Sequence, residues 1–190
     1  MDTEELPPDE IRPAHEVAVR ALALFSAVAT ALGAPRSEVV SWLTKERLWE
    51  ELSPRELTFL SREDAQERTR INFSWQSERL IVLLWALGKV PSLPAPSVQC
   101  DTRVFQELLP PFAETSAANF VDRAQLRSDQ ELLLKADELL EQHWKARDAQ
   151  LNGRGPPTGI DIEIVQERHH AINWIIGYDG LAWDEVTTDT

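Results

Sequence analysis

The sequence lacks the features that mark secreted and membrane proteins. It has a single cysteine, Cys100, so no internal disulfide can form. The start of the chain is acidic and has neither the positive region nor the apolar run of a signal peptide. The longest unbroken apolar run covers residues 80–87, far short of the roughly 18 residues that a spanning helix needs. These absences predict a cytoplasmic protein that is not embedded in a membrane.

Familiar catalytic signatures are also missing. The sequence contains no nucleophile elbow, phosphate-binding loop, dinucleotide-binding glycine motif, His-Glu-x-x-His motif or Cys-x-x-Cys pair. Cys100 has no basic neighbour in the sequence that would activate its thiol. The sequence therefore predicts no cofactor and favours a protein that is not an enzyme.

Basic residues are few compared with acidic ones. The chain has 19 lysine and arginine residues against 32 aspartate and glutamate residues, which gives a net charge of −13. Surface carboxylates repel phosphates, so this balance disfavours binding to nucleic acid or to an anionic membrane. A basic protein is the better matched partner.

Turn-forming residues are sparse as well, and this decides the fold class. The seven glycines and twelve prolines are grouped, and the stretches between them are too long for ordinary strands. Apolar residues recur at helical spacing from residue 13 to 32, and Ser53 and Ser128 each begin a capping box with glutamate three residues later. A length of 190 residues suits one domain. We predict a compact all-α bundle of roughly seven helices.

The ends of the chain are expected to differ from its middle. Residues 1–12 are acidic and contain paired prolines, a composition typical of a flexible arm, whereas residues 13–190 should form the helical domain. Within that domain we expect Trp183 to hold the tail, residues 181–190, against the helices, because burial of an indole removes a large apolar area from water. Asp184 should then pair with an arginine such as Arg79 or Arg168.

The last predicted helix carries the most suggestive polar stripe. Glu163, Glu167, His170 and Trp174 fall at i, i+4, i+7 and i+11. Glu167 and His170 have the Glu-x-x-His spacing of di-iron bundles, but such sites need that motif twice and two further carboxylates. Only one copy is present. A solvated polar face with local charge pairing is therefore favoured over a metal or acid–base site, and no bound metal is predicted.

Other polar residues lie beside or within apolar stretches. Glu78 and Arg79 directly precede the apolar run, so their burial would require an ion pair or network. His143 shares an apolar helix face, where a hydrogen-bonded core histidine is favoured over a ligand. Asn173 and Trp174 offer N–H donors to a backbone or carboxylate. If the chain is instead an enzyme or small-ligand binder, its pocket would be lined by Glu78, Arg79, Glu167, Arg168, His170, Asn173 and Trp183.

Seven tryptophans are many for a chain of this length. An aromatic stripe that stacks nucleic acid bases needs a positive groove, for which this chain lacks the charge. Most of the tryptophans are therefore predicted to lie in the core.

Several motifs resemble a bacterial family called domain of unknown function 4272. They read SWQSERL at 74–80, LLWALG at 83–88, HWKAR at 143–147, ERHHAINW at 167–174 and WDEVTTDT at 183–190. The resemblance runs from about residue 17 to the C-terminus. It implies a single helical domain in the cytoplasm and supplies no catalytic residues. The leading hypothesis is a non-catalytic acidic interaction or regulatory protein that binds a basic protein partner.

Overall fold

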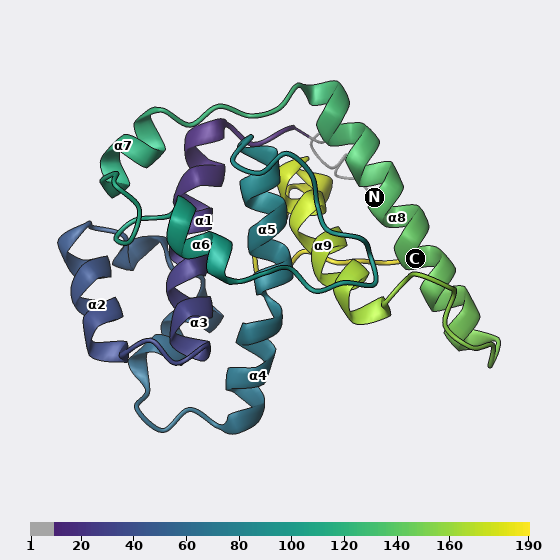
Figure 1. Cartoon of the computed structure of the whole chain (residues 1–190), viewed down its shortest axis with the longest axis horizontal. Coiled ribbons are helices and arrows are strands. Elements are labelled where there is room, and N and C mark those ends of the chain that lie inside the picture. The colour runs from purple at the N-terminus through teal and green to yellow at the C-terminus, as the bar shows by residue number, and fades with distance from the viewer. Residues whose placement is uncertain (1–9) are drawn as a thin grey trace, which may run out of the picture.

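The structure is a computed structural model of the chain, and residues 10–190 are described below. Residues 1–9, which make up most of the predicted arm, lie outside the described residues. The described part of the chain is built from helices and contains no strand, so the predicted all-α class is confirmed (Figure 1). The α-helices are α1 (Ala14–Ala31), α2 (Arg36–Lys45), α3 (Pro54–Ser61), α4 (Glu67–Trp75), α5 (Ser77–Ala86), α6 (Arg103–Leu108), α7 (Ala117–Asp122), α8 (Asp129–Leu151) and α9 (Ile162–Ile175).

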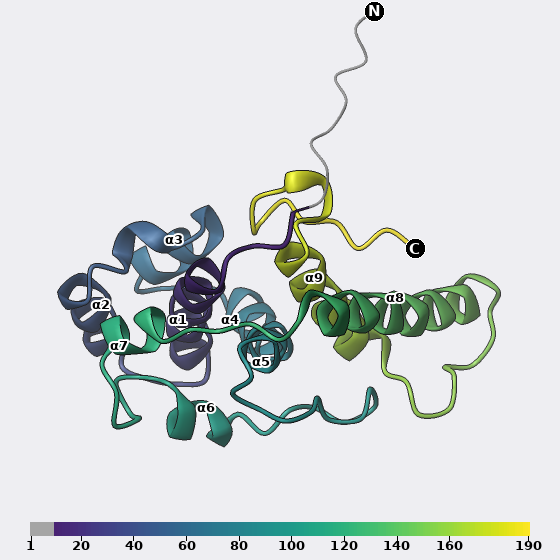
Figure 2. The same cartoon turned by 90° about the horizontal axis from the view of Figure 1, so that it is seen from above.

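The core is organised as a row of helices. α1 packs against α5, α5 against α9 and α9 against α8, while α2, α3, α4 and α7 surround α1. α8 thus lies at one edge of the molecule, and α2 lies at the opposite edge (Figures 1 and 2). By length and composition α1 is apolar enough to cross a membrane, but 67% of it is buried here. Its apolar residues are accounted for by its position at the centre of the core.

The helix boundaries follow local capping chemistry. Ser53 and Ser128 both form the predicted capping boxes, in which the serine hydroxyl accepts from a backbone N–H three residues later and glutamate accepts from the serine N–H. Asp161 caps α9 by accepting from the Glu163 and Ile164 N–H groups. These caps fix where α3, α8 and α9 begin.

Two features differ from the expected pattern. The segment that leads into the apolar run is divided into α4 and α5, because Gln76 has ψ near −2° and ends the first helix. α7 lies where no helix was expected. Its six residues are too few to show a helical repeat of apolar positions.

The start of the described chain packs against its end. Arg12 donates from Nε to the Trp174 carbonyl at 2.9 Å and from Nη2 to the Leu181 carbonyl at 2.7 Å. Gly177 has φ +74°, and a Cβ there would lie 2.1 Å from the Glu10 carbonyl oxygen. Only glycine allows this approach. The residues just before α1 therefore help to hold the segment that follows α9.

Candidate functional site

Two adjacent pairs of charged residues meet where α5 packs on α9. α5 contributes Glu78 and Arg79, and α9 contributes Glu167 and Arg168. Neighbouring residues on a helix point about 100° apart, so one pair turns inward and the other outward. Arg168 Nε donates to Glu78 Oε2 at 2.8 Å, and both side chains are only 1% exposed. The predicted buried ion pair is therefore present.

This inner pair also holds the proline-rich connector between α5 and α6. Arg168 donates to the carbonyls of Pro94 and Val98, at 2.6 and 3.1 Å. The other oxygen of Glu78 accepts from the Cys100 backbone N–H at 2.6 Å. Burial, followed by the charge of Glu78, raises the pKa of the Cys100 thiol to about 12. Cys100 is thus a protonated packing residue and not a nucleophile.

The outer pair includes a histidine. Arg79 Nε donates to Glu167, and its Nη1 donates to His170 Nε2 at 2.9 Å. A guanidinium has no acceptor, so Nε2 of His170 accepts and carries no proton. Burial, followed by the charge of Arg79, lowers the pKa of His170 to about 2. The His170 lone pair is occupied by Arg79, which leaves it free neither for a metal nor for proton abstraction.

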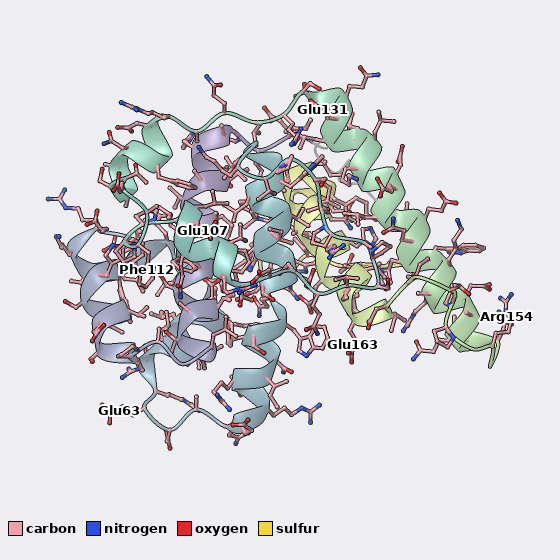
Figure 3. The ribbon with its side chains drawn as sticks, viewed as in Figure 1. Glu63, Glu107, Phe112, Glu131, Arg154 and Glu163 are labelled. Atoms are coloured by element: carbon pink, nitrogen blue, oxygen red, sulfur yellow. The ribbon has the colours of Figure 1, made fainter. Side chains whose placement is uncertain are left out.

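The tail covers the polar face of α9 that the sequence predicted to be solvated. The Trp183 ring lies edge-on to His170 at 5.0 Å and to Trp174 at 5.3 Å between centroids. All three side chains are buried. Glu163, one turn before Glu167, remains exposed at the start of α9 (Figure 3). The expectation of a solvated stripe was therefore wrong beyond Glu163, because an indole from outside the helix packs on it.

Backbone groups fix the tail, in place of the expected arginines. Asp184 accepts from the Arg55 backbone N–H at 2.9 Å, at the start of α3. Asn173 donates to the Thr187 carbonyl at 3.1 Å. Asp184 does not pair with Arg79 or Arg168, because Glu167 and Glu78 already occupy those guanidinium groups.

A second buried ion pair, between Arg20 and Glu56, was not identified from the sequence. Arg20 lies in the middle of apolar α1, and Glu56 is the glutamate of the α3 capping box. The Arg20 guanidinium carbon lies 5.0 Å from the Trp183 ring centroid. Among residues 10–190, the buried atoms Arg20 Nε, Glu56 Oε1 and Trp183 Nε1 have no hydrogen-bond partner.

His143 does not converge on Glu167 and His170. It faces His169 between α8 and α9, with 3.1 Å between the two Nδ1 atoms. Burial lowers the pKa of both histidines, that of His169 to about 4. One neutral ring must donate to the other at this distance. The expectation of a hydrogen-bonded core histidine is thus met, and His169 and His170 point to different neighbours.

Together these contacts describe a structural network. The four charges at the α5–α9 contact are paired, and His170 is held by Arg79. Within residues 10–190 no group of three His, Cys, Asp or Glu side chains is placed to hold a metal ion. Glu78, Arg79, Glu167, Arg168 and His170 therefore come together as paired groups, with Trp183 packed against His170 and Arg79.

The tail contact leads to a testable expectation. Replacing Trp183 by serine should lower the free energy of unfolding by about 2–3 kcal/mol, because it exposes the apolar surface that the indole buries. Urea unfolding followed by circular dichroism measures this loss. Trp144→Ser, which changes a tryptophan that is 52% exposed, is the matched control and should stay within about 0.5 kcal/mol. Equal stability of the two variants would show that the tail is not structural.

The outer side of α8 exposes an apolar row that sequence reasoning missed. Leu133, Leu140, Trp144 and Leu151 are 42–72% exposed. Their spacing of 7, 4 and 7 residues places them within about 20° of one line along the helix, over about 27 Å. Most tryptophans were predicted to be core, and Trp144 is the exception that lies more than half exposed. α8 packs on α9 along one side only, so no element among residues 10–190 covers this apolar row (Figure 2).

A row of carboxylates runs beside the apolar row. Asp137, Glu141 and Asp148 lie about 40–80° from the apolar row when viewed down the helix axis, on the side away from the buried face. Glu141 and Asp148 form exposed ion pairs with Lys145 and Arg154, and no described residue pairs with Asp137. α8 as a whole carries six acidic residues against three basic ones. Its outer surface therefore combines apolar contact area with negative charge.

Comparison with known proteins places the chain in a family. No curated protein and no solved structure matches it. The family model described as Domain of unknown function (DUF4272) matches residues 3–186, which is almost the whole chain. The chain therefore belongs to the family whose motifs its sequence resembles.

Proposed function

We propose that the protein is a non-catalytic interaction protein that binds a basic protein partner through the outer face of α8. The observation that carries this proposal is the exposed apolar row of α8 with the acidic row beside it. Monomeric proteins rarely leave such an extended apolar patch uncovered unless it serves binding. The fitting partner is an amphipathic helix whose apolar residues contact the leucines and Trp144 and whose lysines or arginines face the carboxylates.

The electrostatics support a basic partner over a neutral one. Asp137, Glu141 and Asp148 all lie on the same side of the apolar row. A partner helix with lysines or arginines along one edge would bind in one orientation. In the reversed orientation its cations would lie on the other side of the apolar row and would not contact the carboxylates. The net charge of −13 adds long-range attraction for a basic protein. Trp144, in the inner half of the row, is the type of large aromatic residue that contributes most to binding energy.

A second copy of the chain fits this face less well. The spacing of 7, 4 and 7 residues reads the same in both directions, so two antiparallel copies of α8 could align their apolar rows. The two acidic rows would then meet on one side of the interface, with Glu141 near Glu141 of the other copy. Like charges in such a position are repulsive. This repulsion favours a basic partner.

The internal network supports a non-catalytic function. Arg79, Glu167, Glu78 and Arg168 are used in pairs, and Arg79 occupies the lone pair of His170. An enzyme site needs such groups to converge on an open pocket where a substrate can reach them. The Trp183 ring instead packs against His170 and Arg79, and the Glu78–Arg168 pair is buried in the core.

The test uses designed helical peptides of 18 residues. One carries a row of leucines beside a row of lysines, and its match has glutamate in place of every lysine. We expect the lysine peptide to bind at least about tenfold tighter in fluorescence anisotropy, with an affinity that falls as salt is raised. Leu140→Ser and Trp144→Ser should each weaken this binding about tenfold, since both remove contact area at the centre of the row.

Ile71→Ser provides the matched control. Ile71 is 46% exposed on α4, so its replacement removes an exposed apolar side chain outside the α8 face. Binding that is weakened equally by Ile71→Ser, or is untouched by Leu140→Ser, would be non-specific attraction to an acidic protein and would contradict the proposal. Self-association that Trp144→Ser abolishes, seen by sedimentation equilibrium, would assign the face to a second copy instead.

A further inference from the structure

A cavity of about 620 Å³ lies on the far side of the molecule from α8. The end of α1, the turn that follows it, α2 as far as Trp42, the start of α6 and the turn after α6 line it. Figure 3 shows Phe112 entering this region from that turn, between α2 and α6. The volume falls within the roughly 300–1,000 Å³ of sites that bind small molecules. Neither the polar network nor the α8 face accounts for it.

The lining is mainly apolar and aromatic. Phe25 forms edge-to-face contacts with Phe105 and Phe112, at 6.5 and 6.1 Å between ring centroids, and Trp42 adds a fourth aromatic side chain. Phe112 is 57% exposed and Leu32, also in the lining, is 51% exposed. A ligand with an apolar body would remove these two side chains from water.

The charges around the cavity favour a cation. Arg103 is in the lining, but Asp101 accepts from its Nε and Nη2, so its positive charge is paired. Glu38 also lines the cavity, is exposed, and forms no ion pair with any described residue. The end of α1 and the start of α2 carry opposite partial charges that offset one another here. The carboxylate of Glu38 is therefore the charge left to meet a ligand.

We propose that this cavity binds a small amphipathic cation, a molecule with an aromatic or aliphatic body and one protonated amine. The body packs on the exposed side chains of Phe112 and Leu32, and the amine contacts Glu38. The site is independent of the proposed function, because α2 and α6 contribute nothing to the α8 face. Loss of one binding activity therefore leaves the other measurable.

Three probes with the same body and different head groups test the proposal. They are 4-phenylbutylamine, 4-phenylbutan-1-ol and 4-phenylbutanoate, each titrated into the full chain and followed by backbone amide shifts in nitrogen-15 spectra. We expect chemical shift changes for residues around the cavity. The amine should bind about fivefold tighter than the alcohol, which is the gain expected from a single exposed ion pair, and the carboxylate should bind most weakly. A carboxylate that binds as tightly as the amine would overturn the assignment to cations.

Two variants separate the head group from the body. Glu38→Gln should bring the affinity for the amine down to that for the alcohol and leave the alcohol unchanged. Phe112→Ala should weaken all three probes about fivefold or more, because it removes an aromatic face. Glu107→Gln, an exposed carboxylate on α6 outside the lining, is the control and should change nothing (Figure 3). Binding that survives Phe112→Ala would locate the probes elsewhere and refute the site.

Discussion

Replacement of Glu78 by alanine should lower the free energy of unfolding by about 3–5 kcal/mol, because it leaves the charge of Arg168 buried and unpaired. Both side chains are 1% exposed, so water cannot replace the lost carboxylate without opening the core. The Cys100 N–H would lose its acceptor as well, and a buried backbone donor without a partner adds to the cost. The expected result is a large shift of the urea midpoint and a loosened connector between α5 and α6.

The matched control is Glu141→Ala. Glu141 forms an ion pair with Lys145 at 2.6 Å, but both side chains are at least half exposed. Exposed pairs contribute little, so this variant should stay within about 1 kcal/mol of the parent chain. The double variant Glu78→Leu and Arg168→Leu should be more stable than Glu78→Ala, since it removes both buried charges. A Glu78→Ala chain as stable as the Glu141→Ala chain would contradict this account of the core.

The sequence predicts the need for the buried pair but not the identity of its members. Glu78 and Arg79 are marked by their position beside an apolar run, because buried charges require partners. Which of them meets Arg168 and which meets Glu167 depends on how α5 is rotated and shifted against α9. No local pattern contains that information. Arg20 shows the same limit, since its partner Glu56 is recognisable in the sequence only as part of a capping box.

The helices themselves were more predictable than their contacts. The beginnings of α3, α8 and α9 follow from hydrogen bonds between residues two or three apart, and such bonds are visible in the sequence. The break at Gln76 lacks a comparable signal, whereas α7 begins at a capping serine, Ser116, but has only six residues. Local chemistry therefore sets where capped helices begin, whereas the break between α4 and α5 has no such local cause.

The outer face of α8 was missed for a related reason. Its leucines and Trp144 have the composition of a core, and most tryptophans are at least half-buried in this chain. Their exposure follows from tertiary packing, because α8 contacts α9 along one side and no described helix covers the other (Figure 2). The same composition would be buried if another helix lay there. An apolar row of this kind becomes a candidate binding face only when its neighbours are known.

Stability should fall as the pH is lowered from about 6.5 toward 4, because the fold holds three histidines neutral. Burial lowers the pKa of all three histidines from the ordinary value of 6.5. The pKa of His169 falls to about 4 and that of His170 to about 2, and the pKa of His143 is lowered as well. The unfolded chain therefore binds more protons than the folded chain below pH 6.5, so acid favours unfolding, and the full stability is present above that pH. At pH 5 the loss should be roughly 2 kcal/mol for each of His169 and His170.

Urea unfolding at half-unit steps from pH 8 to pH 5 measures this dependence. His170→Gln keeps an acceptor for Arg79 but cannot be protonated, so its stability should fall less steeply, by up to about 1.4 kcal/mol per pH unit. His15→Gln removes an exposed histidine and is the matched control, which should follow the parent chain. Nearby arginines also lower these pKa values, because a protonated histidine would be repelled by their positive charge. Arg147 acts on His143 in this way, and Arg79 and Arg55 act on His170. Parallel curves for His170→Gln and the parent chain would mean that His170 takes up its proton at the same pH in the folded and the unfolded chain, in conflict with its burial and its hydrogen bond from Arg79.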